Sequence, residues 1–440
     1  MPPPSWYTDP RFMALEEERV FKRNWQYAGP VSKLKEPGDY FTGKMFGLGF
    51  LVCMDEQRQV RAYHNVCSHR AMAVATGDGR APLCEGTGTM PGLRFECPYH
   101  GWQFDMDGRF RGCKIANGLA GIRNFTPETS SLWPIRCEVW GPLVFLHLGD
   151  NKDLPPVAEV MGAGGELLAS EGLKDDDWVF HKRVEYPMAW CVPCFYAHLV
   201  VACACPDAAP CSNWKCMVDN YEDGNYHVYL AHSHLINCFY MDASHNDLFD
   251  NMTSMWGPNV PKPEWPASGL PGAEGYNIME SRTRGGKDQS YSMLYPNVFW
   301  NRYGIWHSVT NVTPTGVDSC LTTFDLFFKK ETLADADFVA KCVSAEDHLQ
   351  KEDIDLCLRV SENLRNPRYD AGRYAPIEVR LARMPAAASW VELSCFAARR
   401  PRCGSFTRSS TTASSAPRRA SSTAPGAATA TISRRREASF

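Results

Sequence analysis

The sequence predicts an α+β protein in which a small all-β domain precedes a larger domain of antiparallel strands and helices. Residues 40–148 consist of short β-prone runs that Gly and Pro interrupt, which is typical of an all-β domain. Residues 291–328 contain aromatic-rich strands with partial alternation, and residues 346–364 carry an apolar stripe at helical spacing. The order of these segments predicts the two domains.

The composition is that of a globular protein. The chain has 440 residues, enough for two or three domains, and 44% of them are hydrophobic. No apolar run reaches the ~18 residues of a membrane span, so we expect no membrane segment. The net charge of −4 gives no reason to expect a nucleic-acid partner. Eighteen cysteines without a recognisable secretory signal favour metal ligation and reduced thiols over a disulfide framework.

The N-terminal residues show a helical pattern. Residues 11–25 carry apolar side chains at helical spacing, and Asp9-Pro10 supplies a start signal. We expect residues 1–39 to form a helical segment that packs on the larger domain. The first residues show no charged and apolar leader pattern, so any organelle address is missing or unrecognisable.

Two short motifs in the all-β region each supply one thiolate and one imidazole. The first is Cys67-Ser-His69 and the second is Cys97-Pro-Tyr-His100. Two Cys and two His can hold a tetrahedral zinc ion, but zinc sites usually combine a Cys pair with a His pair. In a Rieske [2Fe–2S] cluster, two His replace two Cys on one iron. One Cys and one His in each motif therefore favour the Rieske cluster over zinc.

Residues 219–232 carry a second candidate iron site. His227 and His232 are five residues apart, and Asn220, Asp223 and His227 share one stripe of an ideal helix. Both imidazoles can reach one ion only if the helix loosens between them, as a π-bulge would allow. Two His and one carboxylate form the ligand set of non-haem Fe(II) oxygenases. The alternative is a pair of core histidines on a buried helix.

A carboxylate lies on the apolar stripe of the helix predicted at 346–364. Asp353 is close in rotation to Leu349, whereas Glu352 and Asp355 fall outside the stripe. A buried acid is costly unless it is paired or binds a metal. Asp353 is therefore the candidate third iron ligand, and a salt bridge to an unidentified Arg is the alternative.

Together these motifs resemble the α-subunits of Rieske non-haem iron oxygenases. The resemblance rests on the two Cys/His motifs and on the histidines of the 219–232 stretch. Further segments are similar to the plant-type choline monooxygenases in particular: residues 5–10, 38–43, 64–70, 295–297, 301–304 and 372–376. The resemblance extends from about residue 5 to residue 376.

The resemblance implies a Rieske [2Fe–2S] all-β domain at residues 40–150. It implies a helix-grip-like catalytic domain, an antiparallel sheet with covering helices, at residues 151–380. The implied ligands of the [2Fe–2S] cluster are Cys67, His69, Cys97 and His100. The implied ligands of the mononuclear Fe(II) are His227, His232 and Asp353, and the resemblance points to the pair Glu352-Asp353 at this place.

The implied activity is ferredoxin-dependent hydroxylation of choline to betaine aldehyde hydrate, the first step of glycine betaine synthesis. Reduced ferredoxin would supply the electrons, and choline and O₂ would be the substrates of a homotrimer. In the family, electrons cross between neighbouring subunits through an acid bonded to a cluster histidine. Asp223 takes this place, with Asn220 beside it, although many relatives have the acid three residues before the histidine rather than four. The implied compartment is the chloroplast stroma, although no transit peptide is visible; the cytoplasm is the alternative.

Three stretches depart from the family pattern. Residues 81–92 lengthen the connection between the cluster motifs, and we expect a Gly-rich surface loop, which costs little closure entropy. Residues 190–211 are an apolar, Cys-rich insertion, for which retained intron sequence and a third metal site are the alternatives. Residues 381–440 form a Ser/Ala/Arg-rich tail that we expect to be disordered, either able to bind anionic partners or translated in the wrong frame.

The aromatic-rich strands offer a candidate cage for a quaternary ammonium group, which ring faces attract. We expect most of these rings to be sheet core, and the cage candidates are Trp300, Tyr303 and Trp306. Six basic residues surround the cluster motifs and are either solvated charge or a docking patch for ferredoxin: Arg70, Arg80, Arg94, Arg109, Arg111 and Lys114. Two other functions remain open, namely oxygenation of another quaternary ammonium or aromatic substrate and a non-catalytic product whose insertions spoil the iron site.

Overall fold

The computed structural model describes residues 2–86, 89–188, 212–232, 245–257 and 289–373. By its internal contacts the chain divides into two units, residues 1–392 and residues 393–440, and every described residue belongs to the first. The Cys-rich segment at 190–211 and the tail at 381–440 lie outside the described residues. No helix in the described part of the chain is long and apolar enough to cross a membrane.

Two N-terminal helices pack near the helix that precedes the candidate iron-site histidines, and an ion pair links them to it. They are α1 (Ser5–Thr8) and α2 (Pro10–Arg19). The buried carboxylate of Glu16 in α2 accepts a hydrogen bond at 2.7 Å from the buried ammonium of Lys215. Lys215 belongs to α5 (Trp214–Tyr221), so this ion pair links the N-terminal segment to the helix that precedes both iron-site histidines.

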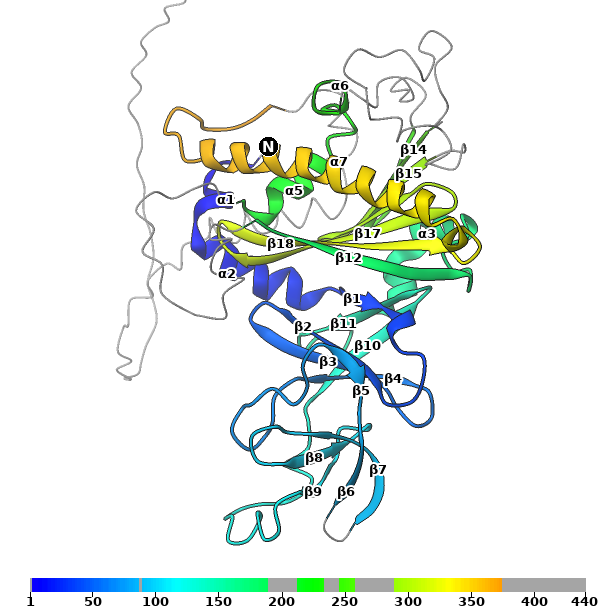
Figure 1. The fold of residues 1–440 in the computed structure, drawn as a ribbon. Helices are drawn as coiled ribbons and strands as arrows, with labels where there is room; N and C mark the ends of the chain where they lie inside the picture. Colours follow the sequence, from blue (N-terminus) through cyan, green and yellow to red (C-terminus); the bar gives the residue numbers. More distant parts are fainter. Residues whose placement is uncertain (1, 87–88, 189–211, 233–244, 258–288, 374–440) are drawn as a thin grey trace, which may run out of the picture. The chain divides into compact units, whose positions relative to one another are not determined.

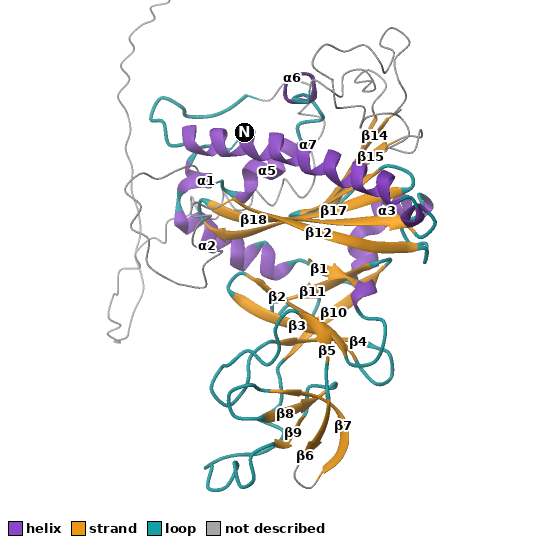
Figure 2. Cartoon of the chain, in the orientation of Figure 1, coloured by secondary structure: helices purple, strands orange, loops and turns teal. Residues whose placement is uncertain are grey.

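The all-β region consists of two antiparallel sheets (Figure 2). One has seven strands in the spatial order β1 (Gln26–Pro30), β11 (Leu143–His147), β10 (Pro134–Trp140), β4 (Val60–His64), β3 (Leu48–Met54), β2 (Asp39–Met45) and β5 (Asp78–Arg80). The other has four strands, β6 (Leu83–Gly86), β7 (Thr89–Glu96), β8 (Trp102–Asp105) and β9 (Phe110–Cys113). Because β1 is buried beside β11, the segment expected to be helical also contributes a strand.

The stretch at 81–92 is not an irregular surface loop as expected. Its residues contribute to the antiparallel pair β6 and β7, in which Leu83 pairs with Leu93 and Cys84 with Gly92. Ladder hydrogen bonds satisfy backbone groups that a loop would leave to water. The extra residues therefore extend a hairpin of the four-stranded sheet.

A second seven-stranded antiparallel sheet forms the larger domain. Its spatial order is β12 (Trp178–Met188), β18 (Ser319–Lys329), β17 (Trp306–Gly316), β16 (Val298–Arg302), β15 (Gln289–Leu294), β14 (Met252–Gly257) and β13 (His245–Leu248). The long helix α7 (Ala336–Asn363) lies across one face of this sheet, with α5 packed beside it (Figure 1). The opposite face packs into a core with α3 (Val157–Ser170) and with Trp25 and Trp140.

The residues that flank the segment 189–211 meet in space. The backbone amide of Ser212 donates a hydrogen bond to the carbonyl oxygen of Met188 at 3.4 Å. The end of strand β12 therefore lies next to the residues that precede α5. A connection whose ends already touch can be shortened at little cost, since each doubling of loop length changes the closure free energy by only ~0.6 kcal/mol.

Replacing residues 190–211 by two glycines should therefore preserve the fold. We expect the midpoint of thermal unfolding to stay within about 2 °C of that of the full chain, which for a chain of this size corresponds to a change of about 2 kcal/mol. Differential scanning calorimetry measures the midpoint, and metal analysis of the same sample gives the iron content. Loss of folded protein or of iron would show that the segment contributes to the core or to the iron site.

Candidate metal centres and substrate pocket

The two Cys/His motifs lie in tight turns at strand ends. The first follows β4, and its turn is closed by a hydrogen bond from the Cys67 amide to the Met72 carbonyl oxygen at 2.7 Å. The second joins β7 to β8, and the Cys97 amide donates to the Trp102 carbonyl oxygen at 2.8 Å. The Gly101 amide donates back to the Cys97 carbonyl oxygen at 2.9 Å. These short closures fix where each thiol and imidazole points.

The four predicted cluster ligands converge. The rings of His69 and His100 are 4.5 Å apart between centroids, and the thiols of Cys67 and Cys97 are buried. Burial raises the pKa of the Cys67 thiol to about 11, and the Cys97 thiol adds to the rise. A thiol whose pKa is raised in this way ionises at neutral pH only beside a strong positive charge, which a bound metal supplies.

One imidazole nitrogen at this place lacks a hydrogen bond. The Nδ1 atom of His100 is buried and has no hydrogen-bond partner among the described residues. A buried polar atom of this kind normally has a partner, and a metal ion would serve as one. Two buried thiols and an unbonded imidazole nitrogen therefore fit a [2Fe–2S] cluster.

The stretch at 219–232 is not the loosened single helix that we predicted. Helix α5 ends before a turn, and α6 (Val228–Ala231) begins after it. Gly224 and Asn225 in the turn have left-handed φ angles of 71° and 63°. A left-handed residue ends helical hydrogen bonding. The π-bulge prediction is therefore wrong, and a break between two short helices places the two iron-site histidines at either end of α6.

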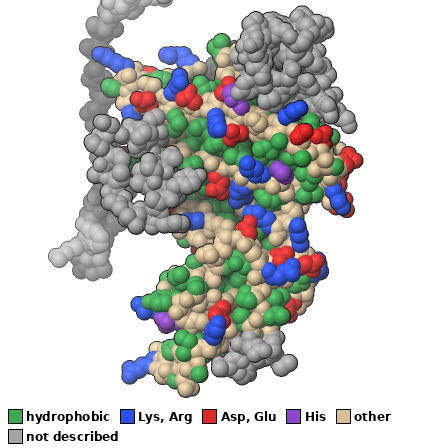
Figure 3. Space-filling view, viewed as in Figure 1, with side chains coloured by type: hydrophobic (Ala, Val, Ile, Leu, Met, Phe, Trp, Pro, Cys, Tyr) green, Lys and Arg blue, Asp and Glu red, His purple; other side chains and the backbone are tan. Residues whose placement is uncertain are grey.

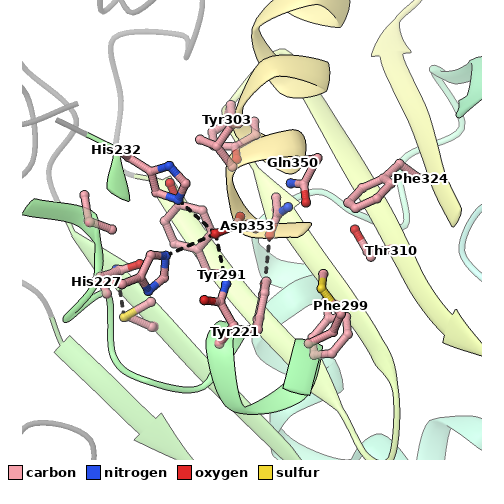
Figure 4. A pocket seen from close by; sticks show the side chains of 17 residues that line it. Tyr221, His227, His232, Tyr291, Phe299, Tyr303, Thr310, Phe324, Gln350 and Asp353 are labelled. Atoms are coloured by element: carbon pink, nitrogen blue, oxygen red, sulfur yellow. Dashed lines mark hydrogen bonds and ion pairs between the residues drawn. The ribbon is translucent and has the colours of Figure 1, made fainter. Parts of the chain in front are cut away.

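His227, His232 and Asp353 point toward one another (Figure 4). The Asp353 Oδ1 atom lies 3.4 Å from His227 Nε2 and 3.0 Å from His232 Nε2. One ligand atom from each residue lies within 4.8 Å of the other two. This donor set of two imidazoles and one carboxylate matches that of non-haem Fe(II) sites.

The charges of this triad favour a cation. Burial would raise the pKa of Asp353, but the imidazoles of His227 and His232 hold it far below its ordinary range. Burial would likewise lower the pKa of His227, but hydrogen bonds to Asp223 and Asp353 raise it to about 10. Metal binding displaces protons from imidazoles held in this way.

Each iron-site histidine has a carboxylate behind it. The Asp223 Oδ2 atom lies 2.6 Å from His227 Nδ1, and the Glu352 Oε2 atom lies 2.7 Å from His232 Nδ1. Donation from Nδ1 fixes the tautomer that leaves the Nε2 lone pair for a metal. Asp223 and Glu352 therefore orient the two imidazoles.

The third ligand candidate is also oriented. The Asn220 side-chain amide donates to Asp353 Oδ1 at 2.9 Å. Sequence reasoning did not find the contact of Glu352 with His232, because the stripe argument placed Glu352 outside the apolar face. Its only signal was its place beside Asp353 in the family pattern.

A cavity of about 70 Å³ lies beside the triad. In Figure 4 the triad lies at one side of this pocket, and Gln350, Thr310 and Phe324 lie at the other. Its described lining contains neither Lys nor Arg. Five aromatic rings line it: Tyr221, Tyr291, Phe299, Tyr303 and Phe324.

Only one of the three cage candidates lines the pocket. Tyr303 does, whereas Trp300 lies on the opposite face of the sheet, 6.2 Å from the ring of Trp140. Alternate residues of a strand face opposite sides of the sheet. Since Trp300 faces away from the pocket, the odd-numbered residues of β16 face toward it, and Phe299 and Asn301 line it. Trp306 is stacked on Phe328 at 5.8 Å within the core under α7. Both tryptophans are therefore core residues.

Most of the six basic residues around the cluster motifs are buried or ion-paired. Arg94 is buried and donates to Gln103 at 2.9 Å. On the face shown in Figure 3, acidic and basic side chains are interspersed. Three ion pairs of 2.6–2.9 Å neutralise others of the set: Arg80–Asp39, Arg111–Asp105 and Lys114–Glu96. The geometry favours solvated ion pairs over a dedicated basic surface.

A two-Cys, two-His site on a β domain, followed by a two-His, one-carboxylate site under a helix-covered sheet, defines a Rieske non-haem iron oxygenase. Residues 24–123 match the Rieske [2Fe-2S] domain family, and residues 176–391 match the catalytic domain of ring hydroxylating alpha subunits. The chain belongs to this family of oxidoreductases. Its cofactors are accordingly a Rieske [2Fe–2S] cluster and a mononuclear iron.

Its relatives include oxygenases of quaternary ammonium compounds. The chain is 33% identical over 378 residues to the chloroplastic choline monooxygenase of Arabidopsis thaliana. The matched stretch covers 86% of this chain and 79% of that relative. The chain is 24% identical over 372 residues to the carnitine monooxygenase oxygenase subunit of Escherichia coli K12, covering 83% and 85%. A crystal structure of a quaternary ammonium Rieske monooxygenase with an inhibitor has the same fold, with a TM-score of 0.66, 22% identity and coverage of 84% and 87%.

Proposed function

We propose that this chain is a monooxygenase that hydroxylates choline to betaine aldehyde hydrate. The observation that carries the proposal is the small aromatic pocket beside His227, His232 and Asp353. Each ring face attracts a quaternary ammonium group by about 0.5–2 kcal/mol. A pocket lined by five rings suits such a cation, and its volume of about 70 Å³ favours a small one.

The charge of the pocket lining favours choline over carnitine as the substrate. Carnitine carries a carboxylate, and burying a carboxylate without a cationic partner is costly. The described lining residues supply no Lys or Arg for such a partner. Choline has a hydroxyl but no carboxylate, and the neutral side chain of Asn220 beside the triad can serve that hydroxyl. The higher identity with choline monooxygenases supports the same choice.

The reaction replaces one C–H bond on the carbon that bears the choline hydroxyl with a C–OH bond. The other atom of O₂ accepts two electrons, which the reduced ferredoxin supplies, and two protons, and it leaves as water. The mononuclear iron, when bound, supplies the activation of O₂. The side chains of this chain hold the metal through the triad, orient its ligands through Asp223, Glu352 and Asn220, and hold the ammonium group so that the carbinol carbon faces the triad.

We assign the delivery of electrons to Asp223. Members of the family take electrons from a reductase or ferredoxin and form multimers, and for this chain we propose ferredoxin and a homotrimer. The carboxylate of Asp223 already bonds the His227 imidazole. Its second function would be a hydrogen bond to a cluster histidine of a neighbouring subunit. We propose the chloroplast stroma as the compartment, since the Arabidopsis relative is named chloroplastic.

Turnover with purified ferredoxin and ferredoxin reductase tests the proposal. We expect betaine aldehyde to form with choline in a one-to-one ratio to O₂ consumed, and little product from L-carnitine or benzoate. Faster turnover of L-carnitine or benzoate would reject choline as the substrate. Absence of product from all three, in protein that shows the Rieske signal but holds only about two irons per chain, would favour the non-catalytic alternative.

A further inference from the structure

A buried carboxylate lies behind the wall of the substrate pocket. Glu346 is 2% exposed and lies on α7, seven residues before Asp353. Seven residues are close to two helical turns, so both side chains leave the same face of α7. A rise of ~1.5 Å per residue places the two positions about 10 Å apart along the helix. Glu346 therefore stands at the far end of the pocket from the iron triad.

Neutral donors that line the pocket hold this carboxylate. Its Oε1 atom accepts from Gln350 Nε2 at 3.2 Å and from Asn301 Nδ2 at 3.4 Å, and both donors belong to the pocket wall. Ser308 Oγ donates to the same oxygen at 3.0 Å. An ionised carboxylate is an acceptor only, and three donors on one oxygen suit that form.

A second hydrogen bond fixes the orientation of this wall. The Tyr221 hydroxyl donates to Asn301 Oδ1 at 2.8 Å, so the amide nitrogen of Asn301 faces Glu346. The ring of Tyr221 lines the pocket. The aromatic lining and the buried carboxylate are thus joined in one hydrogen-bonded network, in which the amide side chains of Asn301 and Gln350 connect the carboxylate to the cavity wall.

We propose that Glu346 is a specificity-determining residue that makes the pocket selective for a cation, acting through Asn301 and Gln350. Ring faces attract a cation only at short range, whereas a buried full charge acts across several ångströms because little water screens it. The ammonium group is drawn to the Glu346 end, which leaves the reacting carbon at the triad. This inference rests on the proposed function, since it takes the substrate to be a small ammonium alcohol.

A shape-matched pair of substrates that differ in charge tests the inference. Choline and 3,3-dimethyl-1-butanol have nearly the same shape, but the second has carbon in place of nitrogen and no charge. Glu346→Gln keeps the size and removes the charge. We expect this variant to raise KM for choline at least about 10-fold, to change kcat little, and to leave KM for the neutral alcohol unchanged. Glu346→Asp, which keeps the charge, should retain most of the preference for choline.

The control is Glu362→Gln, which removes the same charge from an exposed position of α7 and should leave both KM values unchanged. An equal loss of affinity for choline and the neutral alcohol in Glu346→Gln would reduce Glu346 to a structural residue and overturn the inference. An unchanged KM for choline would also overturn it.

Glu346→Asp serves if Glu346→Gln does not fold, because it keeps the charge but moves it away from the pocket wall while the aromatic rings stay unchanged. It should weaken the binding of tetramethylammonium about 2-fold or more and leave the binding of tert-butanol unchanged, and an equal effect on both would overturn the inference. If the protein binds tetramethylammonium through Glu346 but does not oxidise choline, the proposed substrate fails while the inference holds. If choline is oxidised without dependence on Glu346, the inference fails and the proposed function holds.

Discussion

An Asp223→Asn variant is expected to keep about three irons per chain and an unchanged Rieske electron paramagnetic resonance spectrum, yet to lose roughly 100-fold or more of its product formation. The amide can still occupy the place of the carboxylate beside His227 Nδ1, which lies 2.6 Å from Asp223 Oδ2. It cannot act as an anionic acceptor for two imidazoles at once. The direct measurement is the rate at which the reduced cluster is oxidised when choline and O₂ are added.

The matched control for this prediction is Glu352→Gln. Glu352 makes the same kind of contact with the other iron-site histidine, His232, at 2.7 Å. Loss of this contact should weaken iron binding or slow turnover by about 10–100-fold, but the cluster should still be oxidised at nearly the normal rate in the molecules that hold iron. If both variants slowed oxidation of the cluster equally, Asp223 would be only a partner of the ligand His227 and not part of the electron path.

An Asp353→Ala variant is expected to lose the mononuclear iron and with it all detectable hydroxylation. The iron content should fall from about three to about two per chain, with the Rieske signal intact. The physical reason is that Asp353 supplies the only carboxylate of the triad, and two imidazoles alone hold Fe(II) weakly. Metal analysis together with the reduced-state spectrum checks this outcome.

Asp355→Ala provides the comparison on the same helix. Asp355 is exposed and forms a surface ion pair with Arg359, so its loss should change neither the iron content nor the activity. If Asp353→Ala retained three irons, another group would have to complete the iron site. If it lost the cluster as well, the variant would have disturbed the fold rather than one site.

Local sequence carried most of the information about metal chemistry. The identity of the ligands and their spacing within short segments indicated a cluster at Cys67, His69, Cys97 and His100, because one tight turn can present one thiol and one imidazole. The same holds for His227 and His232, which flank a single short helix. Asp353 could be selected because the helical period placed it on the apolar stripe, and burial of a carboxylate is costly unless it is paired or binds a metal.

Properties that depend on packing were not accessible in this way. The chain breaks at Gly224 and Asn225 instead of forming the predicted π-bulge. Trp300 lies on the face of β16 that packs into the core, so it does not line the pocket. Register decides such outcomes, because a shift of one residue turns a side chain to the other face of a sheet. A helix period predicts that a side chain is buried, but not which neighbour it meets.

The sequence by itself indicated the two iron centres, since six of the seven candidate ligands lie in short motifs and Asp353 alone comes from a distant helix. Only the tertiary structure decided which carboxylates stand behind them and what surrounds the substrate. The contact of Glu352 with His232 joins residues 120 positions apart, and Glu346 reaches the pocket wall only because α7 lies on the sheet. Contacts of this kind arise from the packing of a helix on a sheet, which no local pattern of residues specifies.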